Sequence, residues 1–215
     1  MAHTSEYFPD GTPISEWFYD TSVPMLAEMG APYSITEYGA LDDGRIHTRE
    51  IQAAIDTAAQ NGGGVVIVPP GTYLSGALYF KQGVNLYVER GATLKGSDNL
   101  VDYDLTETRC EGETCLYYSA LINADGLDGF TISGPGTIDG NGLRSWQAFW
   151  LRRRWNPQCT NKDEQRPRLV YLSHCRNVLF AGITLQNSHF WTTHLYRCSR
   201  VRYCRLFRRH AAHQF

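Results

Sequence analysis

The feature that most constrains this chain is a short string that recurs in its C-terminal third. The strings CRNV (175–178) and CSRV (198–201) stand 23 positions apart (198 − 175), and each opens onto alternating apolar residues. A period in the twenties, carried by short strand-like runs, is typical of a solenoid in which each unit stacks on its neighbour. The sequence therefore predicts a stack of β-coils.

Short alternating segments fill the chain from residue 65 onward. The order strand, glycine corner, strand is shared by residues 130–139 and 178–186. A right-handed parallel β-helix explains this order better than a sandwich, whose hairpins would need tight two-residue turns. We therefore predict an all-β solenoid with strands in the runs 65–68, 73–80, 84–88, 121–122, 130–132, 169–172, 178–185 and 194–203.

One segment before these strands has a helical period. Ile51, Ala54, Ile55 and Ala58 fall at i, i+3, i+4 and i+7, Thr48 is a suitable N-cap, and glycines 62–64 end the pattern. This predicts a short helix over about 48–60. A solenoid needs such a cap, because an open end would expose apolar core and unpaired strand edges.

The remaining segments divide the chain. Residues 1–32 are predicted to be an N-terminal extension and 33–204 the β-helix domain, interrupted by an acidic loop at about 98–118. A second insertion, at about 143–167, combines tryptophans with arginines. It either packs its aromatic rings on the solenoid or forms an aromatic and cationic wall beside a groove for an acidic sugar polymer. Residues 205–215 lack strand alternation after Phe207 and are predicted to be a divergent basic tail.

Composition and charge argue against several classes of protein. The formal net charge of −2 and the absence of a nucleic-acid-binding motif place a nucleic-acid binder last. No run approaches the ~18 apolar residues of a membrane span, and the first residues lack the pattern of a signal peptide, so we expect a cytoplasmic location and no membrane partner. The six cysteines form no CxxC pair, and we expect neither a metal site nor a cofactor.

Five strings in a fixed order carry a resemblance to a known family. They are YGALDDG (38–44), GGGVVIVPPGTY (62–73), GATLKGS (91–97), GPGTIDGNG (134–142) and QNSHFWTTH (186–194). The chain resembles the polygalacturonases of glycoside hydrolase family 28, within the pectin-lyase-like β-helix superfamily. The resemblance covers about residues 33–204 and matches only the N-terminal portion of such a protein.

The resemblance implies inverting hydrolysis of α-1,4-galacturonide bonds in pectin and oligogalacturonides, acidic plant polysaccharides. That chemistry needs one carboxylic acid and one carboxylate about 6.5 to 9.5 Å apart. The family's Asn-Thr-Asp or Ser-Thr-Asp string is absent from the sequence. The one Asp-Asp pair of the sequence, Asp42-Asp43, stands near the N-terminus and is interpreted as part of a turn, so the family's acids would lie beyond Phe215. We therefore expect a C-terminally incomplete β-helix with no catalytic residue of its own, inactive alone and prone to self-association.

Trp191 and His194 are the candidate substrate-binding residues, because the i, i+3 spacing at an expected strand end could turn both toward the groove. Core packing is the alternative for both. Asp139 is interpreted as a turn residue that binds backbone amides between glycines. Two other functions stay open: a polysaccharide lyase or esterase on the same fold, and a non-catalytic carbohydrate-binding β-helix.

Overall fold

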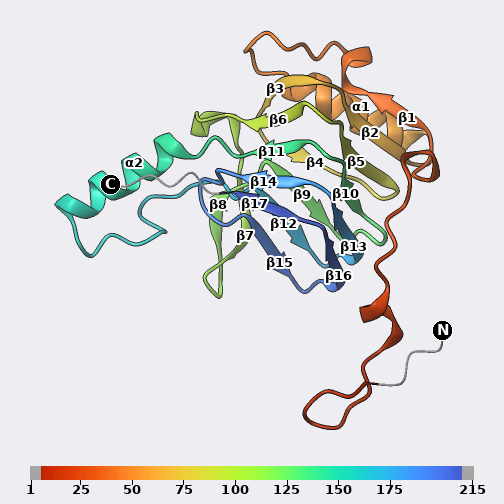
Figure 1. Cartoon of the computed structure of the whole chain (residues 1–215). Helices are drawn as coiled ribbons and strands as arrows, with labels where there is room; N and C mark the ends of the chain where they lie inside the picture. The colour runs from red at the N-terminus through yellow and green to blue at the C-terminus, as the bar shows by residue number, and fades with distance from the viewer. Residues whose placement is uncertain (1–5, 210–215) are drawn as a thin grey trace.

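The computed structural model describes residues 6–209 and shows a parallel β-helix, as the sequence predicts (Figure 1). Three parallel sheets form its walls. The six-stranded sheet contains β1 (Pro32–Ser34), β2 (Gly64–Val68), β5 (Val84–Val88), β10 (Thr131–Ser133), β13 (Arg176–Ala181) and β16 (Ser199–Cys204). The five-stranded sheet contains β3 (Gly71–Ser75), β6 (Ala92–Gly96), β11 (Thr137–Asp139), β14 (Thr184–Gln186) and β17 (Phe207–Arg209). We call the third sheet, formed by β4 (Leu78–Tyr79), β9 (Ile122–Asp125), β12 (Val170–Ser173) and β15 (Thr193–Tyr196), the groove sheet.

The register of the strands confirms the repeat. Phe180 of β13 pairs with Tyr203 of β16, 23 positions later (203 − 180). The two coils before it are longer, because each contains one insertion: 46 positions separate Leu86 from Ile132 (132 − 86) and 48 separate Ile132 from Phe180 (180 − 132). Strands from different coils still pair in parallel, so the insertions leave the stack intact.

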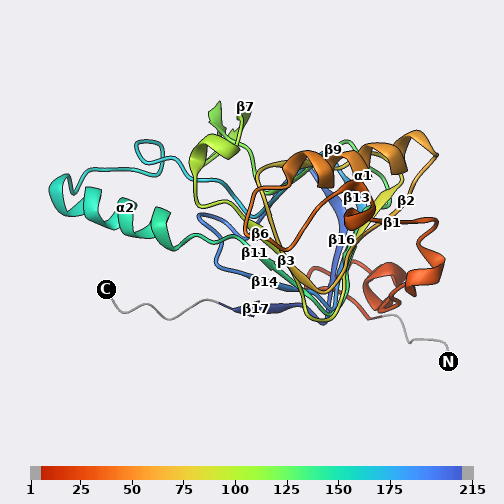
Figure 2. The same cartoon turned by 90° about the horizontal axis from the view of Figure 1, so that it is seen from above.

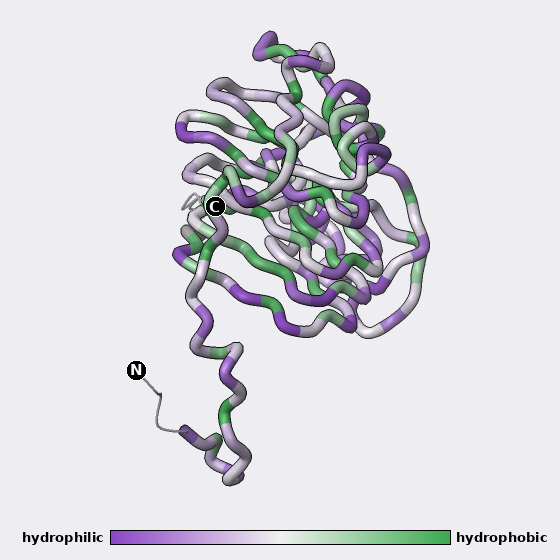
Figure 3. Tube along the Cα trace, turned by 90° about the vertical axis from the view of Figure 1, so that its right-hand side faces the viewer, coloured by the Kyte–Doolittle hydropathy of each residue, from purple (hydrophilic) through white to green (hydrophobic). Residues whose placement is uncertain are grey.

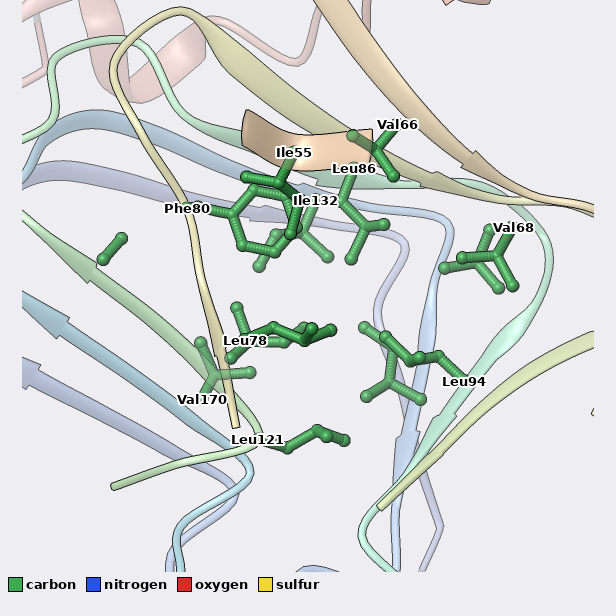
Figure 4. Close-up of a cluster of buried hydrophobic side chains, with 14 of the residues drawn as sticks. Ile55, Val66, Val68, Leu78, Phe80, Leu86, Leu94, Leu121, Ile132 and Val170 are labelled. Carbon is green, nitrogen blue, oxygen red and sulfur yellow. The ribbon is translucent and has the colours of Figure 1, made fainter. Parts of the chain in front are cut away.

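The interior between the three sheets is apolar. Buried aliphatic and aromatic side chains from each wall meet along the axis (Figure 4), among them Val66, Leu78, Leu94, Ile132 and Val170. Alternation explains the pattern, because every second residue of a strand points to the same face. Burial of this size is the main stabilising term for the fold.

Helix α1 (Thr48–Gln60) covers one end of the stack, and the predicted apolar face is fully buried: Ile51, Ala54, Ile55 and Ala58. The N-cap prediction was wrong by one residue, since His47 occupies that position. The hydroxyl of Thr48 instead accepts a hydrogen bond from the backbone N–H of Gly76 at 2.7 Å. A tertiary contact has therefore replaced the local cap.

Both insertions contain more regular structure than the sequence indicated. The segment predicted as an acidic loop holds a short 3-10 helix, η4 (Leu100–Asp102), and an antiparallel hairpin of β7 (Leu105–Cys110) and β8 (Glu113–Tyr118). The second insertion begins with helix α2 (Leu143–Trp155), which projects away from the solenoid in two perpendicular views (Figures 1 and 2).

Regular structure continues past residue 204, where the sequence predicts that the β-helix domain ends. Strand β17 (Phe207–Arg209) pairs in parallel with β14, so three residues of the expected tail continue the five-stranded sheet. Parallel pairing uses backbone groups, which explains why the basic composition of this segment did not prevent a strand. The rest of the expected tail, 210–215, lies outside the described residues, as do residues 1–5.

The N-terminal extension forms an arm (Figures 1 and 3). Its first part lies away from the solenoid, and its later part runs beside the six-stranded sheet up to β1. It carries 3-10 turns η1 (Glu16–Tyr19) and η2 (Leu26–Glu28), and a third, η3 (Ile35–Tyr38), follows β1. Arg202 of β16 donates to the carbonyl of Asp20 at 2.7 Å, and Met29 is buried. Within residues 6–209, no helix has the length and apolar character to cross a bilayer.

Candidate functional site

A column of polar and aromatic side chains runs across the coils on the outer face of the groove sheet. Tyr79 pairs with Asn123, Asn123 with Tyr171, and Tyr171 with His194. Their strand neighbours Leu78, Ile122 and Val170 belong to the buried core. Since successive residues alternate between faces, the column points away from the core.

The β7–β8 hairpin forms a wall beside this column. A depression of about 420 Å³ separates β7 from the groove sheet, and its lining includes Tyr79, Asn123 and Tyr171 together with Thr106, Glu107, Thr108, Asp125, Ser173 and His174. Asn123 is 7% exposed and its amide bonds to backbone groups of Leu78 and Ala120. The hydroxyl and aromatic groups of its neighbours suit a polyhydroxylated ligand, which needs both hydrogen bonds and flat apolar contacts.

The structure brings the two predicted substrate-binding residues together. The rings of Trp191 and His194 meet edge to face with centroids 4.7 Å apart, and the ring of Tyr171 also packs on His194, with centroids 5.0 Å apart. Phe190 stacks on Trp191 at 4.5 Å. Both predicted residues are partly buried, so they combine fixed positions with access to solvent. Their role in binding stays a prediction.

Arg168, which no pattern in the sequence indicated, lies just before β12 and is 1% exposed. Its Nη1 donates to Nδ1 of His194 and to the carbonyl of Arg109, both at 3.0 Å. Its Nη2 donates to Thr108 and to the carbonyl of Tyr118, so the guanidinium also ties the hairpin to the groove sheet. In the sequence, Arg168 is an arginine that directly precedes an apolar strand. Surface arginines occur in the same pattern, so the pattern does not indicate that the side chain is buried.

Burial controls the protonation of two histidines near this region. Burial, with a smaller contribution from the charge of Arg168, lowers the pKa of His194 from 6.5 to about 4. Burial also lowers the pKa of His189, whose ring is 3% exposed, to about 4. Both imidazoles are therefore neutral at pH 6, because burial penalises the charged form.

Two carboxylates line the depression, and unlike the two histidines both are exposed. Asp125 is exposed and lies 3.2 Å from Nδ1 of His174. Glu107 lines the depression from β7 and is exposed. Within residues 6–209, no three His, Cys, Asp or Glu side chains gather in a way that could hold a metal ion.

The aromatic and cationic insertion divides between the two interpretations offered by the sequence. Phe149 is buried with the guanidinium carbon of Arg166 4.0 Å above its ring, and Trp146 donates to the carbonyl of Ser188. These contacts fix α2 to the solenoid. Trp150 and Trp155 are 46% and 86% exposed, and a role for them in sugar binding stays a prediction.

Asp139 has the structural role expected of it. Its carboxylate accepts hydrogen bonds from the backbone N–H of Asn141 at 2.7 Å and from the side-chain amides of Gln186 and Asn187 at 2.7 and 2.9 Å. Three donors on one carboxylate hold the turn after β11 against the next coil.

Comparison with known proteins agrees with this architecture. The pattern of "Glycosyl hydrolases family 28" matches residues 66–207. An endo-polygalacturonase of Pectobacterium carotovorum subsp. carotovorum is 29% identical over 174 residues, covering 76% of this chain and 42% of the relative. An exo-poly-alpha-D-galacturonosidase of Dickeya chrysanthemi is 36% identical over 120 residues, covering 52% of this chain and 20% of the relative.

A solved structure gives the same result in three dimensions. The family 28 exopolygalacturonase of Yersinia enterocolitica superposes with a TM-score of 0.73 at 26% identity, covering 84% of this chain and 39% of that one. The chain thus spans less than half the length of these relatives.

Proposed function

This chain belongs to glycoside hydrolase family 28, and we propose that it supplies part of the groove of a pectin-degrading hydrolase that cleaves α-1,4-galacturonide bonds with inversion. The observation that carries the proposal is the column Tyr79, Asn123, Tyr171 and His194 beside the hairpin wall. A linear sugar chain lying along this column would meet the partly exposed rings of Tyr79, Tyr171 and His194, while Asn123 between them is buried.

Within this proposal the chain binds substrate and does not cleave it. An inverting hydrolase needs an acid and a base about 6.5 to 9.5 Å apart. The Asn-Thr-Asp or Ser-Thr-Asp string of the family is absent from the sequence, and its one Asp-Asp pair, Asp42-Asp43, lies in the turn before helix α1. Glu107 and Asp125 line the depression but do not lie in such strings, and we assign them no catalytic role.

Trp191 and His194 are proposed to contact the sugar. The flat face of an indole suits the apolar face of a pyranose ring, and an imidazole can hydrogen-bond hydroxyl or carboxylate oxygens. Both residues are held in place by ring contacts with their neighbours, which lowers the entropy lost on binding.

Titration calorimetry of the full chain with trigalacturonate, paired with a reducing-end assay on polygalacturonate, tests this proposal. We expect binding without release of reducing ends. Tyr171→Ala should weaken binding about 3- to 10-fold through loss of an aromatic contact. Tyr87→Ala, on the outer face of the six-stranded sheet, is the matched control and should have no effect. Absence of binding would refute the proposal, and hydrolysis would refute the assignment as a binding portion only.

We also propose that the chain self-associates. Tyr203 on β16 is 42% exposed, while its ring stacks on the core residue Phe180, and Leu195, Val201 and Leu206 are only partly buried against the core. Apolar surface next to strand edges favours pairing between chains. Light scattering after gel filtration should give a mass above the 24.3 kDa of one chain, and a monomer at micromolar concentration would refute association.

A cytoplasmic location remains the expectation. All six cysteines are free thiols, which suits a reducing compartment. Fractionation of the native host cells tests it, and recovery outside the cytoplasm would refute it.

A further inference from the structure

Arg168 is an unusual side chain for the interior of a protein. It is among the largest fully buried side chains, and arginine is almost never fully buried unless it is paired with an anion. Within residues 6–209, no carboxylate lies within 4.0 Å of its guanidinium nitrogens, and its Nε has no hydrogen-bond partner. All its hydrogen-bond partners are neutral.

Aromatic rings take the place of a counter-ion. The guanidinium carbon lies 4.3 Å from the ring centroid of Tyr171 and 5.6 Å from that of Tyr117. The negative face of an aromatic ring attracts a cation, more strongly when water is excluded. Tyr171 therefore has Arg168 against its ring and belongs to the column on the groove sheet.

The hydrogen bond between Arg168 and His194 fixes the state of the imidazole. A guanidinium carries only donors, so Nδ1 of His194 must accept and cannot carry a proton. The proton of the neutral ring then resides on Nε2. A doubly protonated ring would place a second cation 3.0 Å from the first and would leave this contact without an acceptor.

The rest of the ring is held by its neighbours. Tyr171 and Trp191 pack on His194, and the imidazole is partly exposed. Among the residues that the structure describes, Nε2 has no hydrogen-bond partner. The groove sheet thus offers the Nε2–H of His194 as a neutral donor at a fixed place. The positive charge of Arg168, which has no anionic partner within residues 6–209, lies on the Nδ1 side of the same ring.

We propose that Arg168 is a positioning residue that holds His194 as the Nε2–H tautomer, so that this N–H donates to a carboxylate oxygen of an acidic sugar in the groove. The inference rests on the function proposed above. It adds a residue, a tautomer and a preference for the free acid over its methyl ester. The charge of Arg168 acts through His194 and Tyr171, since the guanidinium itself is out of reach of the ligand.

Nitrogen-15 NMR of the histidine rings in the full chain, at neutral pH, tests the tautomer without any ligand. His194 should show a protonated Nε2 and an unprotonated Nδ1, and His194→Gln identifies its signals. In Arg168→Met the ring should populate both tautomers. Arg202→Met is the control. It removes an arginine of the six-stranded sheet that binds Asp20 of the N-terminal arm, and it should leave the signals of His194 unchanged. A merely structural role of Arg168 in fixing the hairpin would not select a tautomer.

Binding of trigalacturonate tests the ligand assignment separately. His194→Gln and Arg168→Met should each weaken binding about 10- to 100-fold, the range for a hydrogen bond to a charged group. The fully methyl-esterified trimer should bind the wild-type chain more weakly than the free acid, and this difference should shrink in Arg168→Met.

The outcomes separate the two proposals. A wild-type His194 protonated at Nδ1, or charged, overturns the role of Arg168 even if trigalacturonate binds. The predicted tautomer without binding of either sugar overturns the ligand assignment together with the proposed function. If Arg168→Met does not fold, the tautomer of the wild-type chain and the affinity of His194→Gln still decide the matter.

Discussion

Acid should destabilise this protein through one buried histidine. His189 is 3% exposed and shares a 2.7 Å hydrogen bond between its Nδ1 and the hydroxyl of Ser145. Within residues 6–209 its buried Nε2 has no hydrogen-bond partner. Burial lowers its pKa from 6.5 to about 4, so the folded state keeps the ring neutral over a range in which the unfolded chain protonates it.

The sign and size of the effect follow from proton linkage. Between pH 6.5 and 4.5 the unfolded state binds more protons at this site than the folded state, so the free energy of unfolding falls as the pH falls. A full proton contributes 1.36 kcal/mol per pH unit, which gives a loss of about 2 kcal/mol across this window for His189 alone. His194 changes stability in the same direction, since burial lowers its pKa as well.

Urea denaturation followed by tryptophan fluorescence at pH 6.5, 5.5 and 4.5 measures this loss. His189→Gln removes the titrating ring and should reduce the loss by about 2 kcal/mol. Ser145→Ala is the matched control, because it breaks the same hydrogen bond but leaves the imidazole buried, and it should keep the wild-type pH dependence. If His189→Gln lost as much stability on acidification as the wild type, the reasoning would be wrong.

Three further substitutions test the packing and the turns by urea denaturation. Gly134 has φ +107° and a Cβ there would overlap the carbonyl oxygen of Val88, whereas Gly126 at φ +69° faces open space. Gly134→Ala should therefore cost more than about 3 kcal/mol and Gly126→Ala about 1 kcal/mol, and equal losses would contradict the steric argument. Leu94→Ala in the core should cost about 2 to 5 kcal/mol, while Val101→Ala, at an 81% exposed position, should stay within about 0.5 kcal/mol. Asp139→Ala should cost about 1 to 3 kcal/mol because three donors lose their acceptor, and Asp98→Ala, on the surface, should cost less than about 0.5 kcal/mol.

The solenoid was predictable because its signals are local and repeated. Strand alternation and glycine corners depend on backbone geometry within a few residues, and the recurrence of a four-residue string 23 positions later gives the length of a coil. The structure agrees with the alternation at β5 and with the spacing at the β13–β16 pair. The hairpin was missed because acidic and turn-forming residues around 98–113 hid the alternation in Leu105–Tyr118. Its pairing satisfies backbone groups and needs little apolar surface.

The chemistry of the site was less predictable than the fold. Trp191 and His194 could be selected because they share a strand end, and they do lie together. Arg168 could not, because its burial depends on carbonyl groups of Arg109 and Tyr118, about 50 to 60 residues earlier in the chain. A local pattern carries no information about which distant carbonyl groups will surround a charged side chain.

The column on the groove sheet shows how a regular stack can bring irregularly spaced residues together. Tyr79 and Asn123 are paired, as are Tyr171 and His194, although the first two are separated by the hairpin insertion and the last two by a single short coil. Parallel pairing fixes the register of each coil, so an insertion between two strands of a coil projects from the side of the stack. The same insertions then become the walls of the depression and supply the carbonyl groups that hold Arg168. Changes in insertion length can therefore reshape the groove while the column stays in place, which gives the coils and the insertions separate contributions to binding.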